Sequence, residues 1–156
     1  MDKKTQIRAI RTLYFVMFFV SLWLLAALYL IEQDDDNHAN FLAEPMTLSN
    51  RTTFVLECLT VLYTMFVIYM TTKLLKFPSV CKYIAAQPAR RFQEVEVLRF
   101  AFLESSVLLN GTLYALFQMV PNFYLCVISL IAFVFLYPNR AQCEEFLGGE
   151  QENEED

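Results

Sequence analysis

Four long apolar segments dominate the chain, at about 13–31, 53–72, 98–118 and 119–137. Each has about 20 residues, which as an α-helix rising about 1.5 Å per residue crosses a bilayer core of about 30 Å. A helix of a soluble bundle shows a polar stripe with a period of about 3.6 residues. The first segment shows none, because Ser21 is its only clearly polar side chain. The pattern therefore predicts an all-α fold, a bundle of four transmembrane helices.

Positively charged residues are divided unevenly between the two sides of these segments. Eleven of the 12 Lys and Arg residues precede the first segment, lie between the second and third, or follow the fourth, and only Arg51 lies on the other side. Cationic residues close to a span are retained in the cytoplasm, so this distribution predicts that both termini are cytoplasmic. The inner cations expected to contact lipid headgroups or to fix the topology are Lys73, Lys76, Lys82, Arg90, Arg91 and Arg99.

Proline positions predict how the spans are joined. Pro121-Asn122 predicts a tight external turn, so the third and fourth segments form an antiparallel hairpin. Pro88 predicts the start of a long helix that begins in the cytoplasm and continues into the third span. Proline suits the first turn of a helix, because the backbone N–H that it lacks would have no partner within the helix at that position. Glu96 and Arg99 are three residues apart on this helix and are expected to pair on its surface.

The membrane domain is expected to comprise residues 1–140, with an outer loop at 32–52 and an inner loop at 73–97. Residues 141–156 form an acidic tail expected to be disordered in the cytoplasm. The formal net charge of −5 comes from the outer loop and this tail, and no nucleic-acid partner is implied. The acidic residues around His38 could hold a weak divalent ion, but their spacing does not match an EF-hand, so a solvated loop is favoured.

The side chains that enzymes use are sparse. The chain has one His, and no Gly-rich phosphate loop or paired cysteine motif occurs in it. A nucleophile activated by a neighbouring base is therefore improbable, and no enzyme activity, cofactor or metal is expected. Cys58 and Cys126 lie within the spans and are interpreted as packing residues.

Two carboxylates lie inside the apolar segments and need an explanation. Glu57 is one turn from the outer end of the second span, and Glu104 is about two turns from the inner end of the third. An ionisable group at such depth costs a few kcal/mol. At about 100° per residue, each shares a helix face with small or polar residues. These are Thr60, Thr64 and Thr71 beside Glu57, and Gly111, Ala115 and Gln118 beside Glu104.

Two interpretations of these polar positions follow. In the first, each carboxyl hydrogen-bonds a neighbouring helix and fixes the packing of the bundle. In the second, Glu57 and Glu104 form a relay for protons or cations, which would need polar groups to bridge their difference in depth. Asn110 adds polarity on another side of the third span, which favours a central position for that helix, with an oligomer contact as the alternative.

From Arg91 onward the chain carries two short motifs. Arg99 is followed by Leu103-Glu104, and residues 137–140 (YPNR) lead to residues 144–147 (EEFL) and an acidic end. In these features the last third to two-fifths of the chain resembles an uncharacterised family of small bacterial four-span inner-membrane proteins. The resemblance implies a multi-pass protein of the bacterial inner membrane and brings no established activity.

Together these observations favour a non-enzymatic integral membrane protein, a small structural or accessory subunit that acts by helix packing or partner contact. Its expected partners are the lipid bilayer and either further copies of itself or a larger membrane complex. The alternative function is a proton- or cation-coupled transporter or channel subunit that uses Glu104, with Glu57 as a second candidate. The small size of the chain and the absence of paired repeats count against this alternative.

Overall fold

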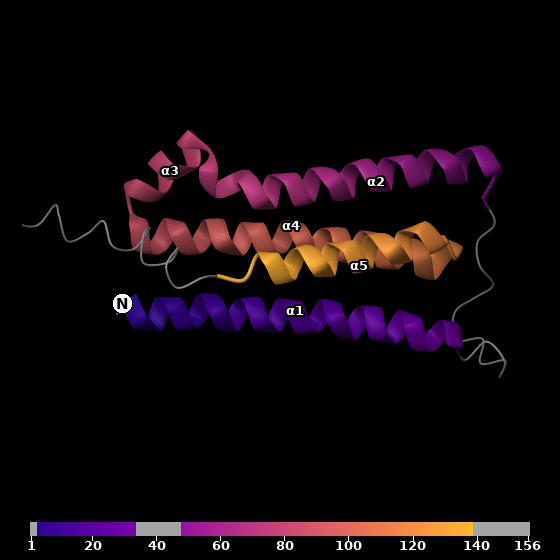
Figure 1. The fold of residues 1–156 in the computed structure, drawn as a ribbon, viewed down its shortest axis with the longest axis horizontal. Helices are drawn as coiled ribbons and strands as arrows, with labels where there is room; N and C mark the ends of the chain where they lie inside the picture. The colour runs from indigo at the N-terminus through magenta and orange to yellow at the C-terminus, as the bar shows by residue number, and fades with distance from the viewer. Residues whose placement is uncertain (1–2, 34–47, 139–156) are drawn as a thin grey trace, which may run out of the picture.

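A computed structural model describes residues 3–33 and 48–138 (Figure 1). All regular secondary structure in these residues is helical. The elements are α1 (Lys3–Gln33), α2 (Asn50–Lys73), the 3₁₀ turn η2 (Leu74–Lys76), α3 (Pro78–Ala85), α4 (Pro88–Phe117) and α5 (Val120–Phe135). The described residues contain no strand, so the predicted all-α class is confirmed. The predictions for the outer loop around His38 and for the tail at 141–156 fall outside the described residues.

Three of the helices are long and apolar enough to cross a membrane, at Thr5–Leu30, Asn50–Lys76 and Arg90–Phe117. Helix α5 is also apolar but has only 16 residues. At about 1.5 Å per residue it is about 24 Å long, less than a bilayer core of about 30 Å. Helix length alone therefore supports three spans.

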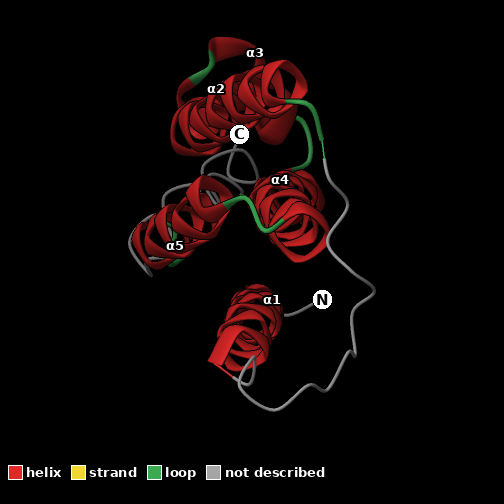
Figure 2. Ribbon diagram, turned by 90° about the vertical axis from the view of Figure 1, so that its right-hand side faces the viewer, coloured by secondary structure: helices red, strands yellow, loops and turns green. Residues whose placement is uncertain are grey.

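Helix α4 lies at the centre of the bundle. In the end-on view of Figure 2, α1 and α2 lie on different sides of α4, and α5 lies beside it on a third. In the most apolar stretch of α4, 39% of the residues are buried inside the protein, compared with 17% for the corresponding stretches of α1 and α2. This arrangement agrees with the central position expected from the polarity of the third segment.

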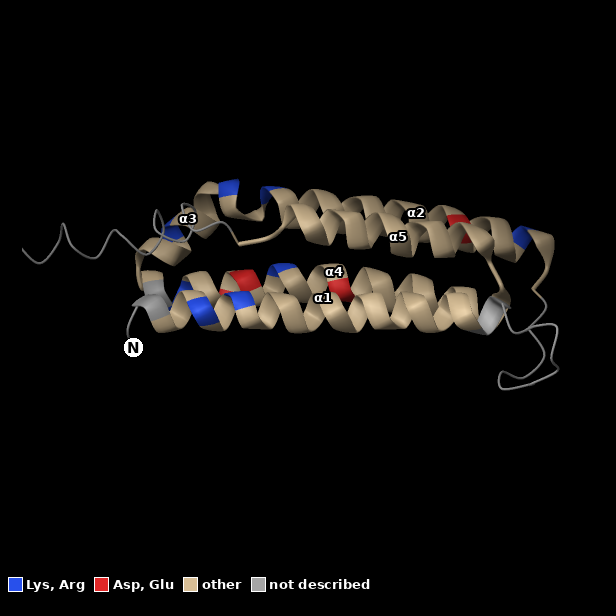
Figure 3. Cartoon of the chain, turned by 60° about the horizontal axis from the view of Figure 1, so that its bottom comes forward, with Lys and Arg blue, Asp and Glu red and all other residues tan. Residues whose placement is uncertain are grey.

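The helix ends gather at two opposite ends of the bundle (Figure 1). The start of α1, the turn η2, α3 and the start of α4 are at one end, and α5 runs back toward it. Figure 3 shows that the Lys and Arg residues of the described chain cluster toward this end, apart from Arg51 at the start of α2. The two ends thus differ strongly in positive charge.

The hairpin between α4 and α5 differs from the prediction. The turn is made by Gln118, whose backbone is left-handed at φ 51° and ψ 37°, and by Met119, which is extended at φ −77° and ψ 93°. Pro121 and Asn122 lie in the first turn of α5 and not in the connection. The predicted Pro121-Asn122 turn is therefore wrong, because the fixed φ of proline and its missing N–H suit the first turn of a helix equally well.

The other helix boundaries agree with the sequence in α4 and α2 but differ in α1. Helix α4 begins at Pro88 as predicted, and α2 continues through η2 to Lys76 before Pro78 starts α3. Helix α1 begins at Lys3, ten residues before the apolar segment starts at 13. A helix therefore extends beyond its apolar stretch at the cationic end of the bundle.

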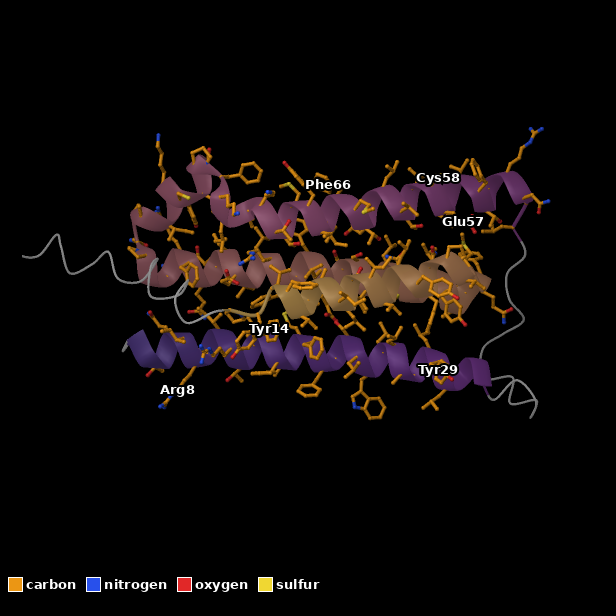
Figure 4. All side chains as sticks on the ribbon, viewed as in Figure 1. Arg8, Tyr14, Tyr29, Glu57, Cys58 and Phe66 are labelled. Atoms are coloured by element: carbon orange, nitrogen blue, oxygen red, sulfur yellow. The ribbon has the colours of Figure 1, made fainter. Side chains whose placement is uncertain are left out.

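The surface of the bundle carries many large apolar side chains. Large apolar side chains on three helices point outward, such as Trp23 of α1 (74% exposed), Leu62 of α2 (67%) and Phe135 of α5 (82%). Figure 4 shows Phe66 on the outer side of α2, away from α4. Soluble monomers rarely expose continuous apolar patches of this extent, whereas a lipid-facing surface requires them.

Candidate functional site

Six buried polar residues from three helices meet between α2, α4 and α5, and we refer to them as the inner polar cluster. Each has an exposed fraction of 3% or less. They are Thr60 and Thr64 of α2, Ser106 and Asn110 of α4, and Asn122 and Ser129 of α5. None of these six side chains titrates near neutral pH.

Asn110 is the centre of the cluster. Its side-chain nitrogen Nδ2 donates to the backbone oxygen of Ser106 (2.8 Å) and to Oγ1 of Thr64 (2.9 Å). The amide orientation is fixed, because a backbone carbonyl can only accept a hydrogen bond. The hydroxyl oxygens of Ser106 and Ser129 are 3.1 Å apart and share a hydrogen bond, so the contact continues to α5.

A second contact links α2 to α5 one helical turn away. The hydroxyl of Thr60 lies 3.2 Å from Oδ1 of Asn122 and 3.0 Å from the backbone oxygen of Glu57. Among the described residues, Oδ1 of Asn110 and Nδ2 of Asn122 are buried without a hydrogen-bond partner. The cluster therefore fixes the packing of three helices even though two of its polar atoms are left unpaired.

The face of α2 that the sequence singled out is the buried one. Thr60, Thr64 and Thr71 are all buried on the Glu57 side of the helix, as the spacing predicted. Glu57 itself is only half-buried, and its part in the cluster is its backbone oxygen. The structure thus brings together the threonines but not the carboxylate.

Glu104 makes its contact on a different side of α4. It accepts a hydrogen bond at Oε2 from the hydroxyl of Ser21, which is fully buried on α1. Gly111 lies on the same face, where an added Cβ would come within 3.2 Å of Leu28 and 3.3 Å of Leu24. Glu104 and Gly111 are therefore part of the contact between α4 and α1, with the carboxyl pairing across it and the glycine allowing close approach.

The two polar regions of α4 are separated by the helix itself. Ser106 is two residues after Glu104, which at about 100° per residue places it about 200° around the helix. Gln118 belongs to neither region, because α4 ends at Phe117 and Gln118 is exposed in the turn that follows. The polar residues that a relay would have to connect thus form separate contacts.

A buried ion pair ties α4 to α2 at the cationic end. Nη1 of Arg99 donates to Oε1 of Glu96, and Nε of Arg99 donates to the backbone oxygen of Thr71 (2.9 Å). The exposed fractions of Glu96 and Arg99 are 1% and 6%. The predicted pairing is confirmed, but its expected position on the helix surface is wrong, since both residues are buried inside the bundle. Arg99 is therefore not available to lipid headgroups.

The remaining inner cations lie on or near the surface. Lys73, Lys76, Lys82 and Arg90 are exposed, and Arg91 is half-buried. Arg91 holds α3 against the start of α4, since its Nη1 donates to the backbone oxygen of Tyr83 (2.9 Å).

The Tyr83 side chain adds a second tie between α3 and α4. Its hydroxyl donates to Oε2 of Glu94 (2.8 Å), and this hydrogen bond raises the pKa of Tyr83 above its ordinary value. Arg90 donates to the other oxygen of Glu94 (3.0 Å). The short helix α3 is therefore fixed at the cationic end.

Three of the side chains that join the helices were not predicted from the sequence, and each has a weak signal there. Ser21 was the only polar residue of an otherwise apolar span, which marks a position that faces the bundle. Ser129 likewise stands among apolar residues in the second half of the fourth segment. Asn122 was assigned to a turn, which hid its place on the buried face of α5.

Among the described residues, no group of three or more His, Cys, Asp or Glu side chains could hold a metal ion. No family model, curated protein or solved structure matches this chain. What the protein does must therefore be inferred from its own residues.

Proposed function

We propose that this chain is a multi-pass protein of the bacterial inner membrane that works as a non-enzymatic structural or accessory subunit. It acts by packing its helices and by contacting a partner within the membrane. The observation that carries this proposal is that the inner polar cluster and the Ser21–Glu104 pair join neighbouring helices by hydrogen bonds. The bacterial location rests on the family resemblance of the C-terminal part.

The proposed topology has four spans with both termini in the cytoplasm. The clustering of Lys and Arg at one end of the bundle supports it, because such residues are retained on the cytoplasmic side. The antiparallel hairpin of α4 and α5 supports it as well, since α5 returns the chain toward the cationic end. A helix as short as α5 can span if the bilayer thins locally or its flanking residues extend the span.

A packing role fits the polar contacts better than transport. A relay between Glu57 and Glu104 would require polar groups that connect them. The inner polar cluster meets Glu57 only through the Thr60 hydroxyl and a backbone oxygen, and it lies on the far side of α4 from Glu104. Hydrogen bonds between transmembrane helices contribute about 0.6 kcal/mol on average and up to about 2 kcal/mol each.

The decisive experiment measures ion flux in proteoliposomes. Purified protein is reconstituted into vesicles, and a proton, sodium or potassium gradient is followed with a fluorescent dye. We expect no flux above that of empty vesicles, and we expect Glu104→Gln to change only helix packing and abundance. The matched control is Glu57→Gln, which removes a half-buried carboxyl that forms no hydrogen bond or ion pair with another helix in the described part of the chain.

Flux through the wild-type protein that Glu104→Gln abolishes, with folding and abundance unchanged, would contradict the proposal. The same result with Glu57→Gln as well would favour a relay through both carboxyls.

A further inference from the structure

One side of α4 is left uncovered by the rest of the protein. Helices α1, α2 and α5 all pack against α4, but the side between α1 and α2 carries exposed residues along most of its length (Figure 2). We call this surface the open face of α4. Its residues include Val97, Ala101, Leu108, Thr112 and Leu116.

The open face combines small and apolar side chains. Val97, Leu108 and Leu116 are 39%, 48% and 42% exposed, which suits an apolar environment. Ala101 and Thr112 are also exposed, and the hydroxyl of Thr112 is bonded to the backbone oxygen of its own helix at Leu108 (2.7 Å). Small residues of this kind let a second helix approach the backbone closely.

Glu104 lies at the edge of the open face that borders α1. It is half-buried, and within the described part of the chain its only hydrogen-bond donor is the Ser21 hydroxyl, which bonds Oε2. A single neutral hydroxyl does not compensate a carboxylate in an apolar environment. Acidic residues in membrane spans almost always pair with another polar or charged group.

The chemistry of Glu104 decides what covers the open face. Lipid tails offer neither a positive charge nor a hydrogen-bond donor. A second copy inserted in the same orientation brings the same residues to the same depth, so it opposes one Glu104 to another. The nearest described cation of α4, Arg99, is already bonded to Glu96 and to the backbone oxygen of Thr71.

We propose that the open face of α4 binds a transmembrane helix of a different protein, and that a Lys or Arg side chain of that helix pairs with Glu104. This inference rests on the proposed function, because it assigns the partner contact to one surface and one residue. The small side chains of Ala101 and Thr112 give the partner helix its close approach, and Glu104 selects it by charge.

A pair of synthetic helices tests the selection directly. One is a Leu/Ala helix of about 20 residues with a single Lys at the depth of Glu104, and the other has Leu in its place. Each is labelled and mixed with labelled protein in phosphatidylcholine vesicles, and association is measured by resonance energy transfer. We expect the Lys helix to associate about tenfold more strongly, which corresponds to the upper range of polar contacts between membrane helices.

Variants of the protein test the residue and the surface. Glu104→Gln should remove the preference for the Lys helix, and Glu104→Asp should retain part of it. Ala101→Trp should block both helices, because it fills the open face. Leu62→Trp is the matched control on the outer side of α2, where Leu62 is 67% exposed, and it should leave association unchanged.

Four outcomes would overturn the inference. The first is that the wild-type protein binds the two helices equally, and this outcome can be observed without making any variant. The preference for Lys could survive in Glu104→Gln, or Ala101→Trp could have no more effect than Leu62→Trp. Energy transfer between two labelled copies of the protein that Ala101→Trp abolishes would assign the face to self-association instead.

Flux measured in the same vesicles without the helices separates this inference from the proposed function. Flux that depends on Glu104 would contradict the proposed function, whichever helix binds. If the protein shows neither flux nor a preference for the Lys helix, the proposed function stands. Only the assignment of the partner contact to Glu104 and the open face is then contradicted.

Discussion

Replacing Arg99 by leucine should destabilise the protein far more than replacing any exposed arginine. The Arg99 and Glu96 side chains are 8% and 2% exposed, and Arg99 also bonds the backbone oxygen of Thr71. Arg99→Leu leaves the carboxylate of Glu96 buried without its positive partner. Breaking a buried ion pair in this way costs about 3–5 kcal/mol, because the remaining charge stays desolvated.

The other single substitution and the double substitution separate charge from packing. Glu96→Gln keeps an oxygen that can accept from Arg99, so we expect it to cost less than Arg99→Leu. The double variant Glu96→Leu/Arg99→Leu removes both charges and should recover most of the lost stability, since apolar replacements of buried pairs are often neutral. A double-mutant cycle built on these leucine variants gives the coupling energy between the two side chains.

Arg90 and Glu94 supply the matched control on the same helix. Their side chains form a 3.0 Å ion pair but are 80% and 44% exposed, so Arg90→Leu should leave the stability unchanged within error. The free energy of unfolding is measured in mixed micelles by titration with denaturing detergent and followed by helical circular dichroism. If Arg99→Leu were no more destabilising than Arg90→Leu, the buried position of the Glu96–Arg99 pair would be refuted.

Three further predictions concern packing and topology. Asn110→Val should lower the free energy of unfolding by about 1–2 kcal/mol in the same detergent titration, whereas Thr112→Val, which removes a hydroxyl bonded only within its own helix, should have little effect. Gly111→Leu should separate α4 from α1, because an added Cβ already meets leucine side chains at 3.2 and 3.3 Å; a disulfide engineered between the two helices should then form more slowly than in Gly111→Ala. In a cysteine-free background, an impermeant maleimide applied from outside should label Arg51→Cys and spare Lys82→Cys, and the reverse pattern would contradict the proposed orientation.

The sequence predicted helices better than their connections. Apolar length and the proline at 88 were sufficient for α2 and α4, since both signals are local. The α4–α5 turn was placed three residues too late because Pro121 fits a turn and a helix start equally well. The positive φ of Gln118 carries no local signal, as glutamine is not a residue that favours the left-handed region.

The burial of polar residues was predictable only where several of them recur on one face of an otherwise apolar helix. The spacing of Thr60, Thr64 and Thr71 located the inner face of α2. The pair Glu96 and Arg99 could not be placed inside from its own spacing, because the same separation suits an exposed pair. The signal was in the wider pattern, since both fall on the line of buried residues that continues to Ser106 and Asn110.

The central position of α4 explains why its polar residues serve different purposes. One side of the helix bonds α2 and α5 through Ser106 and Asn110, and another bonds α1 through Glu104. A helix that packed against a single neighbour would need only one polar side. Polar groups on its other sides would face lipid, and an ionisable group there costs a few kcal/mol. Glu104 receives a single hydrogen bond from α1, that of the Ser21 hydroxyl. The same position that makes α4 the core of the bundle thus leaves one carboxyl at the edge of its open face, where a partner with a positive charge gains most by binding.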